Sequence, residues 1–194
     1  MPGIGVLALQ GDWQAHVLVL KALGGECRAV RTAADLDRVE SLVLPGGESS
    51  AMLRLMEPED LMRRIGDRIA AGMTVLATCA GVILLAEDVE PEQTCLGALA
   101  INVVRNAYGR QVRSSVEQVE VAPPLGPPSS MEAVFIRAPR IVAVGPGVEV
   151  LGRWRDDPVI VRQGHILAAT FHPELTGDRR VHELFLRTGE DQNG

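Results

Sequence analysis

Cysteine is scarce in this sequence of 194 residues. Its three cysteines, Cys27, Cys79 and Cys95, are too few and odd in number for a disulfide framework, and none forms a CxxC pair that binds a metal ion. We therefore expect a reducing compartment, the cytoplasm, and we expect neither a metal ion nor a cofactor to be bound.

Long apolar runs and an excess of positive charge are also absent. No apolar stretch reaches the roughly 20 residues that span a bilayer. Residues 1–12 contain a short apolar run with no Lys or Arg before it and no cleavage pattern after it, which disfavours a signal peptide. The net charge of -6 at pH 7 disfavours nucleic acids and membrane surfaces as partners.

The overall composition is typical of one folded domain. Hydrophobic residues make up 46% and charged residues 23%, close to the averages of globular proteins, which excludes a disordered or fibrous chain. We find no internal repeat. A length of 194 residues fits a single domain that spans residues 1–194.

Residues 1–88 alternate short aliphatic runs with amphipathic ones, which is the pattern of βαβ units around a parallel sheet. Gly24, Gly72 and the turn Pro45-Gly46-Gly47 end these runs, because glycine adopts the left-handed conformation and proline breaks regular structure. The pattern predicts strands at 4–9, 26–31, 41–44 and 74–78, and helices at 13–23, 48–56, 60–71 and 80–86.

Beyond residue 95 the pattern changes to short β-rich runs that turn residues separate. The proline-rich stretch 123–128 is expected to be a surface connection, because proline lacks the amide proton that a central strand donates. The chain is predicted to end in a helix at 179–186 and a disordered tail from Gly189. The predicted strands are 98–104, 115–121, 132–136, 141–144, 148–154, 158–162 and 165–171.

Cys79 is the first candidate for a catalytic residue. The segment Ala77-Thr78-Cys79-Ala80-Gly81 places a thiol between a buried strand and a helix, among small neighbours, as in a nucleophile elbow. The start of the helix offers positive potential and free amide protons, which favour a thiolate. From this segment alone, a nucleophile and a small buried core residue are equally good interpretations. Cys27, within a predicted strand, and Cys95, at the start of another, are interpreted as structural.

A thiol that carries out acyl transfer needs a base and a group that orients this base. In Phe171-His172-Pro173-Glu174-Leu175, His172 and Glu174 lie two residues apart at the end of an apolar strand, so the period of two places both on one face. Glu174 would then hold the imidazole ring of His172 toward Cys79. The remaining histidines are expected to be exposed or to pack structurally: His16, His165 and His182.

The elbow around Cys79, together with His172-Pro173-Glu174, resembles the class I glutamine amidotransferases. Four further segments are similar to the glutaminase subunits of pyridoxal 5'-phosphate synthase, and the similarity runs nearly from end to end. These segments are Gly5-Val6-Leu7-Ala8-Leu9-Gln10-Gly11, Leu44-Pro45-Gly46-Gly47-Glu48-Ser49-Ser50, Arg105-Asn106-Ala107-Tyr108-Gly109-Arg110-Gln111 and Val134-Phe135-Ile136-Arg137-Ala138-Pro139.

The resemblance implies an α/β fold, namely the three-layer, flavodoxin-like class I glutaminase fold with a mostly parallel central sheet and additional short antiparallel strands. It implies that L-glutamine is hydrolysed to L-glutamate and ammonia through a thioester on Cys79. In this reaction His172 would transfer protons, and Glu174 would orient the imidazole ring of His172. The ammonia would pass to a partner chain, the synthase subunit of pyridoxal 5'-phosphate synthase, for vitamin B6 biosynthesis. The two subunits would form a hetero-oligomer.

The same resemblance assigns a substrate site and an oxyanion hole. The backbone amides of Gly47 and Ala80 would form the oxyanion hole. Which arginine meets the α-carboxylate of glutamine stays open. A phosphate-binding loop at Gly46 is disfavoured, because the lysine of that motif is absent. The residues that match glutamine-contacting positions are Gly46, Gly47, Glu48, Ser49, Arg105, Ile136 and Arg137.

Three alternatives remain at this point. The chain is a glutaminase that serves another biosynthetic synthase, a non-catalytic module that keeps the fold, or a redox or chaperone-type protein with a reactive cysteine. The paired Cys79 and His172-Pro173-Glu174 signals disfavour the last two. The segment Val112-Arg113-Ser114-Ser115 departs from the acidic-Ser-Phe pattern common in the family, which leaves open what that segment does in packing or partner docking.

Overall fold

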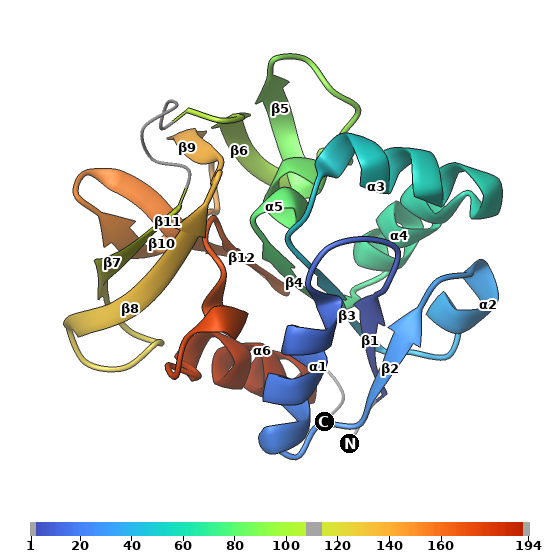
Figure 1. Ribbon diagram of the computed structural model, residues 1–194, viewed down its shortest axis with the longest axis horizontal. Helices are drawn as coiled ribbons and strands as arrows, with labels where there is room; N and C mark the ends of the chain where they lie inside the picture. The colour runs from blue at the N-terminus through green and yellow to red at the C-terminus, as the bar shows by residue number, and fades with distance from the viewer. Residues whose placement is uncertain (1–2, 108–113, 192–194) are drawn as a thin grey trace.

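The computed structural model describes residues 3–107 and 114–191. Within these ranges a nine-stranded sheet has the order β2-β1-β3-β4-β12-β11-β10-β7-β8, and β5, β6 and β9 form a smaller sheet (Figure 1). The strands are β1 (Ile4–Leu7), β2 (Cys27–Val30), β3 (Ser41–Leu44), β4 (Thr74–Thr78), β5 (Ala86–Glu90), β6 (Leu99–Val104), β7 (Ser114–Val121), β8 (Ser129–Ile136), β9 (Arg140–Val144), β10 (Glu149–Trp154), β11 (Asp157–Gln163) and β12 (Ile166–Ala169). The helices are α1 (Trp13–Ala22), α2 (Ala33–Leu36), α3 (Ser49–Met56), α4 (Leu61–Ala70), α5 (Ala80–Leu85) and α6 (Arg180–Asp191), with short 3-10 helices η1 (Glu57–Glu59) and η2 (Pro173–Leu175).

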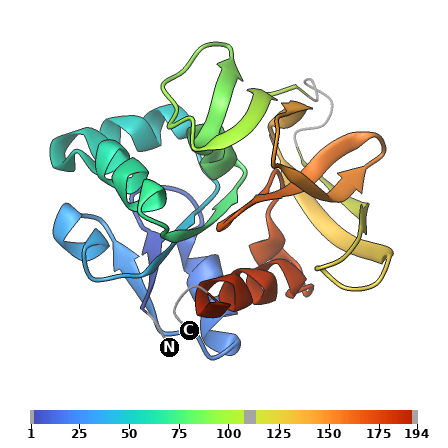
Figure 2. The ribbon, with the colours of Figure 1, turned by 180° about the vertical axis from the view of Figure 1, so that it is seen from behind.

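The N-terminal half of the large sheet is parallel and carries helices on both faces. β1 pairs with β2 and β3, and β4 pairs with β3 and β12, each time in parallel. Successive side chains alternate between the faces, so Val6 and Leu76 pack with α1 and α6, whereas Leu7 and Val75 pack with α2 to α5. This half therefore has three layers, in which α1 and α6 lie side by side (Figure 1 and Figure 2).

The other half of the large sheet is antiparallel and adds an aromatic cluster near the end of β12. β12, β11, β10, β7 and β8 pair in that order, all antiparallel. The ring of Phe135 lies 5.2 Å from that of Trp154 and 5.5 Å from that of Phe171, between centroids. The backbone N–H of His172 donates to the carbonyl of Val134 at 2.8 Å. These contacts hold the end of β8 beside the segment that follows β12.

The fold class is confirmed, with one refinement. The resemblance implied a mostly parallel sheet, but the large sheet has as many antiparallel as parallel pairings, because β7, β8, β10 and β11 extend it instead of forming a separate layer. The predicted bounds of β3 and β4 match the structure. The proline-rich stretch is confirmed as a connection between β7 and β8, although Leu125 within it is buried.

Four local features differ from what the sequence predicted. Helix α2 and strand β5 were not predicted. Cys95 lies between β5 and β6 and belongs to no strand. Helix α6 continues through Gly189 to Asp191, beyond the predicted helix end, and the rest of the predicted tail, residues 192–194, lies outside the described residues. In the described part of the chain, no helix is long and apolar enough to cross a membrane.

Candidate functional site

Cys79 occupies a strained turn between β4 and α5. Its backbone has φ 45° and ψ -103°, a conformation that non-glycine residues seldom adopt, and the residue is only 5% exposed. The helix that follows can approach β3 closely because Gly81 has no side chain: a Cβ there would lie 2.2 Å from the carbonyl oxygen of Leu44. The thiol of Cys79 donates to the carbonyl oxygen of Ile136 at 3.7 Å. The predicted elbow is therefore confirmed as backbone geometry.

His172 and Glu174 meet beside this thiol, but for a different reason than the predicted strand period. β12 ends at Ala169, and the chain then turns into the 3-10 helix η2, which has His172 as its N-cap. The turn brings Nδ1 of His172 to 2.7 Å from Oε1 of Glu174. Both residues are buried. The expectation that they share one face of a strand is thus wrong, whereas the expected contact between them is confirmed.

The electrostatics of this pair favour an imidazolium held by a carboxylate. Burial by itself would lower the pKa of His172, but its hydrogen bonds with Cys79 and Glu174 and their charges raise this pKa above its ordinary value. Burial would raise the pKa of Glu174, but its hydrogen bonds with His16 and His172 and the charge of His172 hold it below its usual range. An ionised Glu174 therefore supports an imidazolium on His172, which forms when the ring takes the proton of the Cys79 thiol.

These opposite shifts predict a pH window for stability. Glu174, with a lowered pKa, stabilises the fold above its ordinary value of 4.5 and loses this contribution as the pH falls. His172, with a raised pKa, stabilises the fold fully below its ordinary value of 6.5 and loses this contribution as the pH rises toward about 10. We expect the pair to contribute most to the free energy of unfolding between these two ordinary values.

Urea unfolding of the wild-type protein and of Glu174→Gln, measured from about pH 4 to 9, checks this window. The difference in unfolding free energy between the two proteins should be largest near the middle of the range and should shrink on both sides. A difference that does not change with pH would contradict the assignment of charges.

The loop between β3 and α3 lies against the imidazole ring. A Cβ on Gly46 would lie 2.3 Å from Cε1 of His172, so only glycine leaves room for the ring in its present place. Gly47 has φ 154°, and the backbone N–H of Glu48 donates to Oε1 of Gln10 at 2.7 Å. The side chain of Gln10 thus fixes this loop from the connection between β1 and α1.

The carboxylate of Glu48 caps α3 and meets a cation. It accepts hydrogen bonds from the backbone N–H groups of Ser50 and Ala51 at 3.2 and 3.0 Å. Its Oε1 lies 3.6 Å from Nη2 of Arg105. Burial would raise the pKa of Glu48, but these hydrogen bonds and the charge of Arg105 lower it.

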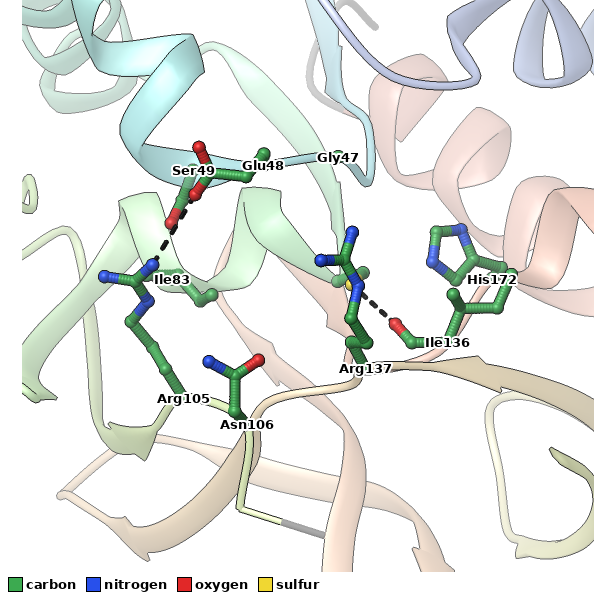
Figure 3. A pocket seen from close by; sticks show the side chains of 10 residues that line it. Gly47, Glu48, Ser49, Ile83, Arg105, Asn106, Ile136, Arg137 and His172 are labelled. Carbon is green, nitrogen blue, oxygen red and sulfur yellow. Dashed lines mark hydrogen bonds and ion pairs between the residues drawn. The ribbon is translucent and has the colours of Figure 1, made fainter. Parts of the chain in front are cut away.

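A pocket opens between these groups and the thiol. Figure 3 shows side chains from the β3–α3 loop, from the end of β6 and from the end of β8 around one hollow, with the contact between Glu48 and Arg105 drawn as a dashed line. His172 lies on the opposite side from Arg105. The lining residues are Gly47, Glu48, Ser49, Cys79, Ile83, Arg105, Asn106, Ile136, Arg137 and His172.

The structure brings together nearly all residues that the sequence singled out. Gly46 lies under the ring of His172 and is not among the lining residues, and Ala80 follows Cys79 as the first residue of α5. Sequence reasoning missed Ile83 and Asn106. Asn106 stands inside the quoted Arg105–Gln111 segment and has φ 53°, whereas nothing in the sequence marks Ile83, one turn after the elbow, as a pocket residue. The described residues do not include 108–113, which cover the rest of the Arg105–Gln111 segment together with Val112 and Arg113.

The other cysteines and histidines lie outside the pocket, and one of them differs from its interpretation. The three cysteines are free thiols. His165 is half-buried, not exposed as expected, and its Nε2 lies 2.9 Å from the carbonyl oxygen of Ile69. No group of three or more potential metal ligands occurs among residues 3–107 and 114–191.

The fold and the placement of thiol, imidazole and carboxylate at one pocket define the class: a class I glutamine amidotransferase. A crystal structure described as a glutamine amidotransferase is similar, with a TM-score of 0.89, 46% identity, and coverage of 96% of this chain and 98% of that chain. PurLQS from Thermotoga maritima, at 16% identity and a TM-score of 0.73, shares the fold.

The chain belongs to the SNO glutamine amidotransferase family, whose model matches residues 6–191. Among its relatives is the pyridoxal 5'-phosphate synthase subunit PdxT of Koribacter versatilis, 53% identical over 194 residues, or 98% of this chain and 97% of that protein. The subunit of the same name from Thermotoga maritima is 50% identical over 184 residues, or 94% and 97% of the two chains. The resemblance found in the sequence is confirmed.

Proposed function

We propose that this chain is the glutaminase subunit of a pyridoxal 5'-phosphate synthase and hydrolyses L-glutamine to L-glutamate and ammonia. The observation that carries this proposal is the convergence of the strained Cys79, the paired His172 and Glu174, and the Glu48–Arg105 pair on one pocket. Membership in the glutamine amidotransferase family supports the same reaction.

The reaction proceeds through a covalent thioester. His172 takes the proton of the Cys79 thiol, and the sulfur attacks the carbon of the side-chain amide of glutamine. The resulting oxyanion collapses as His172 returns the proton to the leaving nitrogen, which departs as ammonia. A water molecule, deprotonated by the same imidazole, attacks the thioester; glutamate leaves and the thiol regains its proton.

The oxyanion is stabilised by backbone amides of Gly47 and Ala80 in this proposal. Gly47 lines the pocket together with Cys79, and Ala80 opens α5, where the first N–H groups have no partner within the helix. The loss of one such donor typically costs about 3 to 4 kcal/mol of barrier. The contact between Gln10 and the loop at Glu48 supports this role, because it fixes the backbone that carries the Gly47 amide.

The substrate site matches the zwitterion of free glutamine. A carboxylate on Glu48 suits the α-ammonium group, and the guanidinium groups of Arg105 and Arg137 suit the α-carboxylate. Ser49 and Ile136 line the pocket and are proposed to contact the glutamine side chain, with Gly46 supporting the wall beneath His172.

The ammonia is used by a separate synthase chain, with which this chain forms a hetero-oligomer. We propose that residues 1–194 form one domain that carries the glutaminase site alone. We also place the enzyme in the cytoplasm, because a free catalytic thiol needs a reducing compartment.

An assay of glutamate release, with and without the purified synthase subunit, tests this function. We expect slow turnover of glutamine by this chain alone and faster turnover with the synthase, together with formation of pyridoxal 5'-phosphate from glutamine. The synthase with ammonium salt and without this chain serves as control. Undetectable turnover in both conditions would contradict the glutaminase, and turnover that only a different synthase stimulates would contradict the partner.

A further inference from the structure

Behind the proposed triad, Glu174 contacts a buried network of polar side chains whose other members the reaction above does not use. Its members are His16 on α1, Thr78 at the end of β4, Glu174 on η2 and His182 on α6, and the side chains of all four are fully or almost fully buried. Nδ1 of His16 lies 3.0 Å from Nε2 of His182. Nε2 of His16 lies 3.1 Å from Oγ1 of Thr78 and 3.3 Å from Oε2 of Glu174.

The hydrogen-bond partners of these four side chains favour one arrangement of protons on the two imidazole rings. Oε2 of Glu174 and Nδ1 of His182 are buried and have no fully formed hydrogen bond among the described residues. If His16 carried a proton on Nδ1, His182 would have to accept at Nε2 and bear its proton on Nδ1, as a buried donor without a partner. In a neutral His16 ring with its proton on Nδ1, the unprotonated Nε2 would also lie against the carboxylate of Glu174, so that two acceptors would face each other.

The opposite arrangement leaves no imidazole N–H without a partner. His182 donates from Nε2 to Nδ1 of His16, and His16 donates from Nε2 to Thr78 and toward Oε2 of Glu174. Nδ1 of His182 is then only an unused acceptor, which costs less than an orphaned N–H. The pKa of His182 is lowered to about 3, with burial as the largest cause, which agrees with a neutral ring.

We propose that His16 is a positioning residue of the glutaminase: its Nε2–H holds the second carboxylate oxygen of Glu174, and His182 fixes the required tautomer. The inference rests on the proposed function. Glu174 then accepts from His172 at one oxygen, and Nε2 of His16 lies 3.3 Å from the other, which opposes rotation of the carboxylate away from the imidazole. His16 also contacts Thr78, the residue before the nucleophile, and thereby links the carboxylate to the elbow.

The tautomers can be observed directly in the wild-type protein. Long-range ¹H–¹⁵N spectra of the histidine rings distinguish Nδ1–H, Nε2–H and charged imidazoles. We expect neutral Nε2–H rings for both His16 and His182, with signals assigned by their loss in His16→Gln and His182→Gln. A His16 ring that is charged or protonated on Nδ1 would overturn the proposal, and this readout does not depend on activity.

Two variants of His16 separate positioning from packing. The amide of a glutamine side chain at this position reaches the place of Nε2, whereas the amide of the shorter asparagine reaches only that of Nδ1. His16→Gln therefore keeps a donor for Glu174, and His16→Asn does not. We expect His16→Asn to lower kcat by about 10-fold, the effect typical of losing one hydrogen bond to a charged group, with KM unchanged. His16→Gln should restore most of the lost kcat.

Thermal unfolding of both variants supplies the control. If His16 had only a structural role, both substitutions would lower kcat equally and in proportion to the loss of folded protein. That result would overturn the proposal. The concentration of active sites, titrated with a glutamine-like chloroketone, corrects kcat for unfolded protein. Absence of glutaminase activity in the wild type would contradict the proposed function instead, and the tautomers would still test the proton arrangement.

Discussion

Replacement of Cys79 by alanine is expected to abolish glutamine hydrolysis, with kcat reduced by a factor on the order of 10⁴ or more. The thiol is the only group in the proposed mechanism that forms the covalent intermediate, and removal of a triad nucleophile typically has an effect of this size. Alanine fits the same turn, because the side chain of Cys79 is buried and only the sulfur is removed. Circular dichroism should therefore report an unchanged fold.

The two other cysteines provide matched controls for this variant. Burial raises the pKa of the thiols of Cys27 and Cys95, which makes both poor nucleophiles at neutral pH. Cys27→Ala and Cys95→Ala should keep glutaminase activity close to that of the wild type. Mass spectrometry after treatment with a glutamine-like chloroketone should locate the label on Cys79 alone. Activity that persists in Cys79→Ala, or labelling spread over all three thiols, would refute the assigned nucleophile.

The second large effect is expected from a single methyl group at Gly46. A Cβ at this position would lie 2.3 Å from Cε1 and 3.0 Å from Nδ1 of His172. The ring of His172 cannot move aside without weakening its hydrogen bond with Glu174 at 2.7 Å, because His172 is buried. Gly46→Ala should displace the imidazole by about 1 Å, and a misplacement of that size can cost about 10²-fold in rate. We expect a corresponding fall in kcat/KM.

Gly177→Ala is the control for Gly46→Ala. Gly177 follows η2 closely in the chain, and an added Cβ there would meet no atom within 4 Å. Its kcat/KM should match that of the wild type. Steady-state kinetics and thermal unfolding of both variants would be compared. If Gly46→Ala were as active as Gly177→Ala, the imidazole would not need its present position, and the role of His172 would have to be revised.

The fold was predictable where the local pattern was strong. The buried runs at β3 and β4 and the glycine stops gave correct elements, because burial on both faces of a parallel strand leaves a continuous aliphatic run. Strand β5 has the sequence Ala-Glu-Asp-Val-Glu, with little β propensity, and forms by pairing with β6. Helix α2 has only four residues, and its signal, the capping box of Thr32 and Asp35, was overlooked.

The chemistry of this protein can be inferred from short sequence segments: a thiol at a strand-to-helix turn, the His172–Glu174 pair, and the segments that reveal its family. Which side chains contact one another follows from the packing of the folded chain. The contact of Gly46 with His172 and the pairing of His16 with His182, 166 residues away, leave no mark in any local pattern. The physical reason is that periodicity reports which face of an element is buried, whereas the packing of separate elements sets the distances between their side chains.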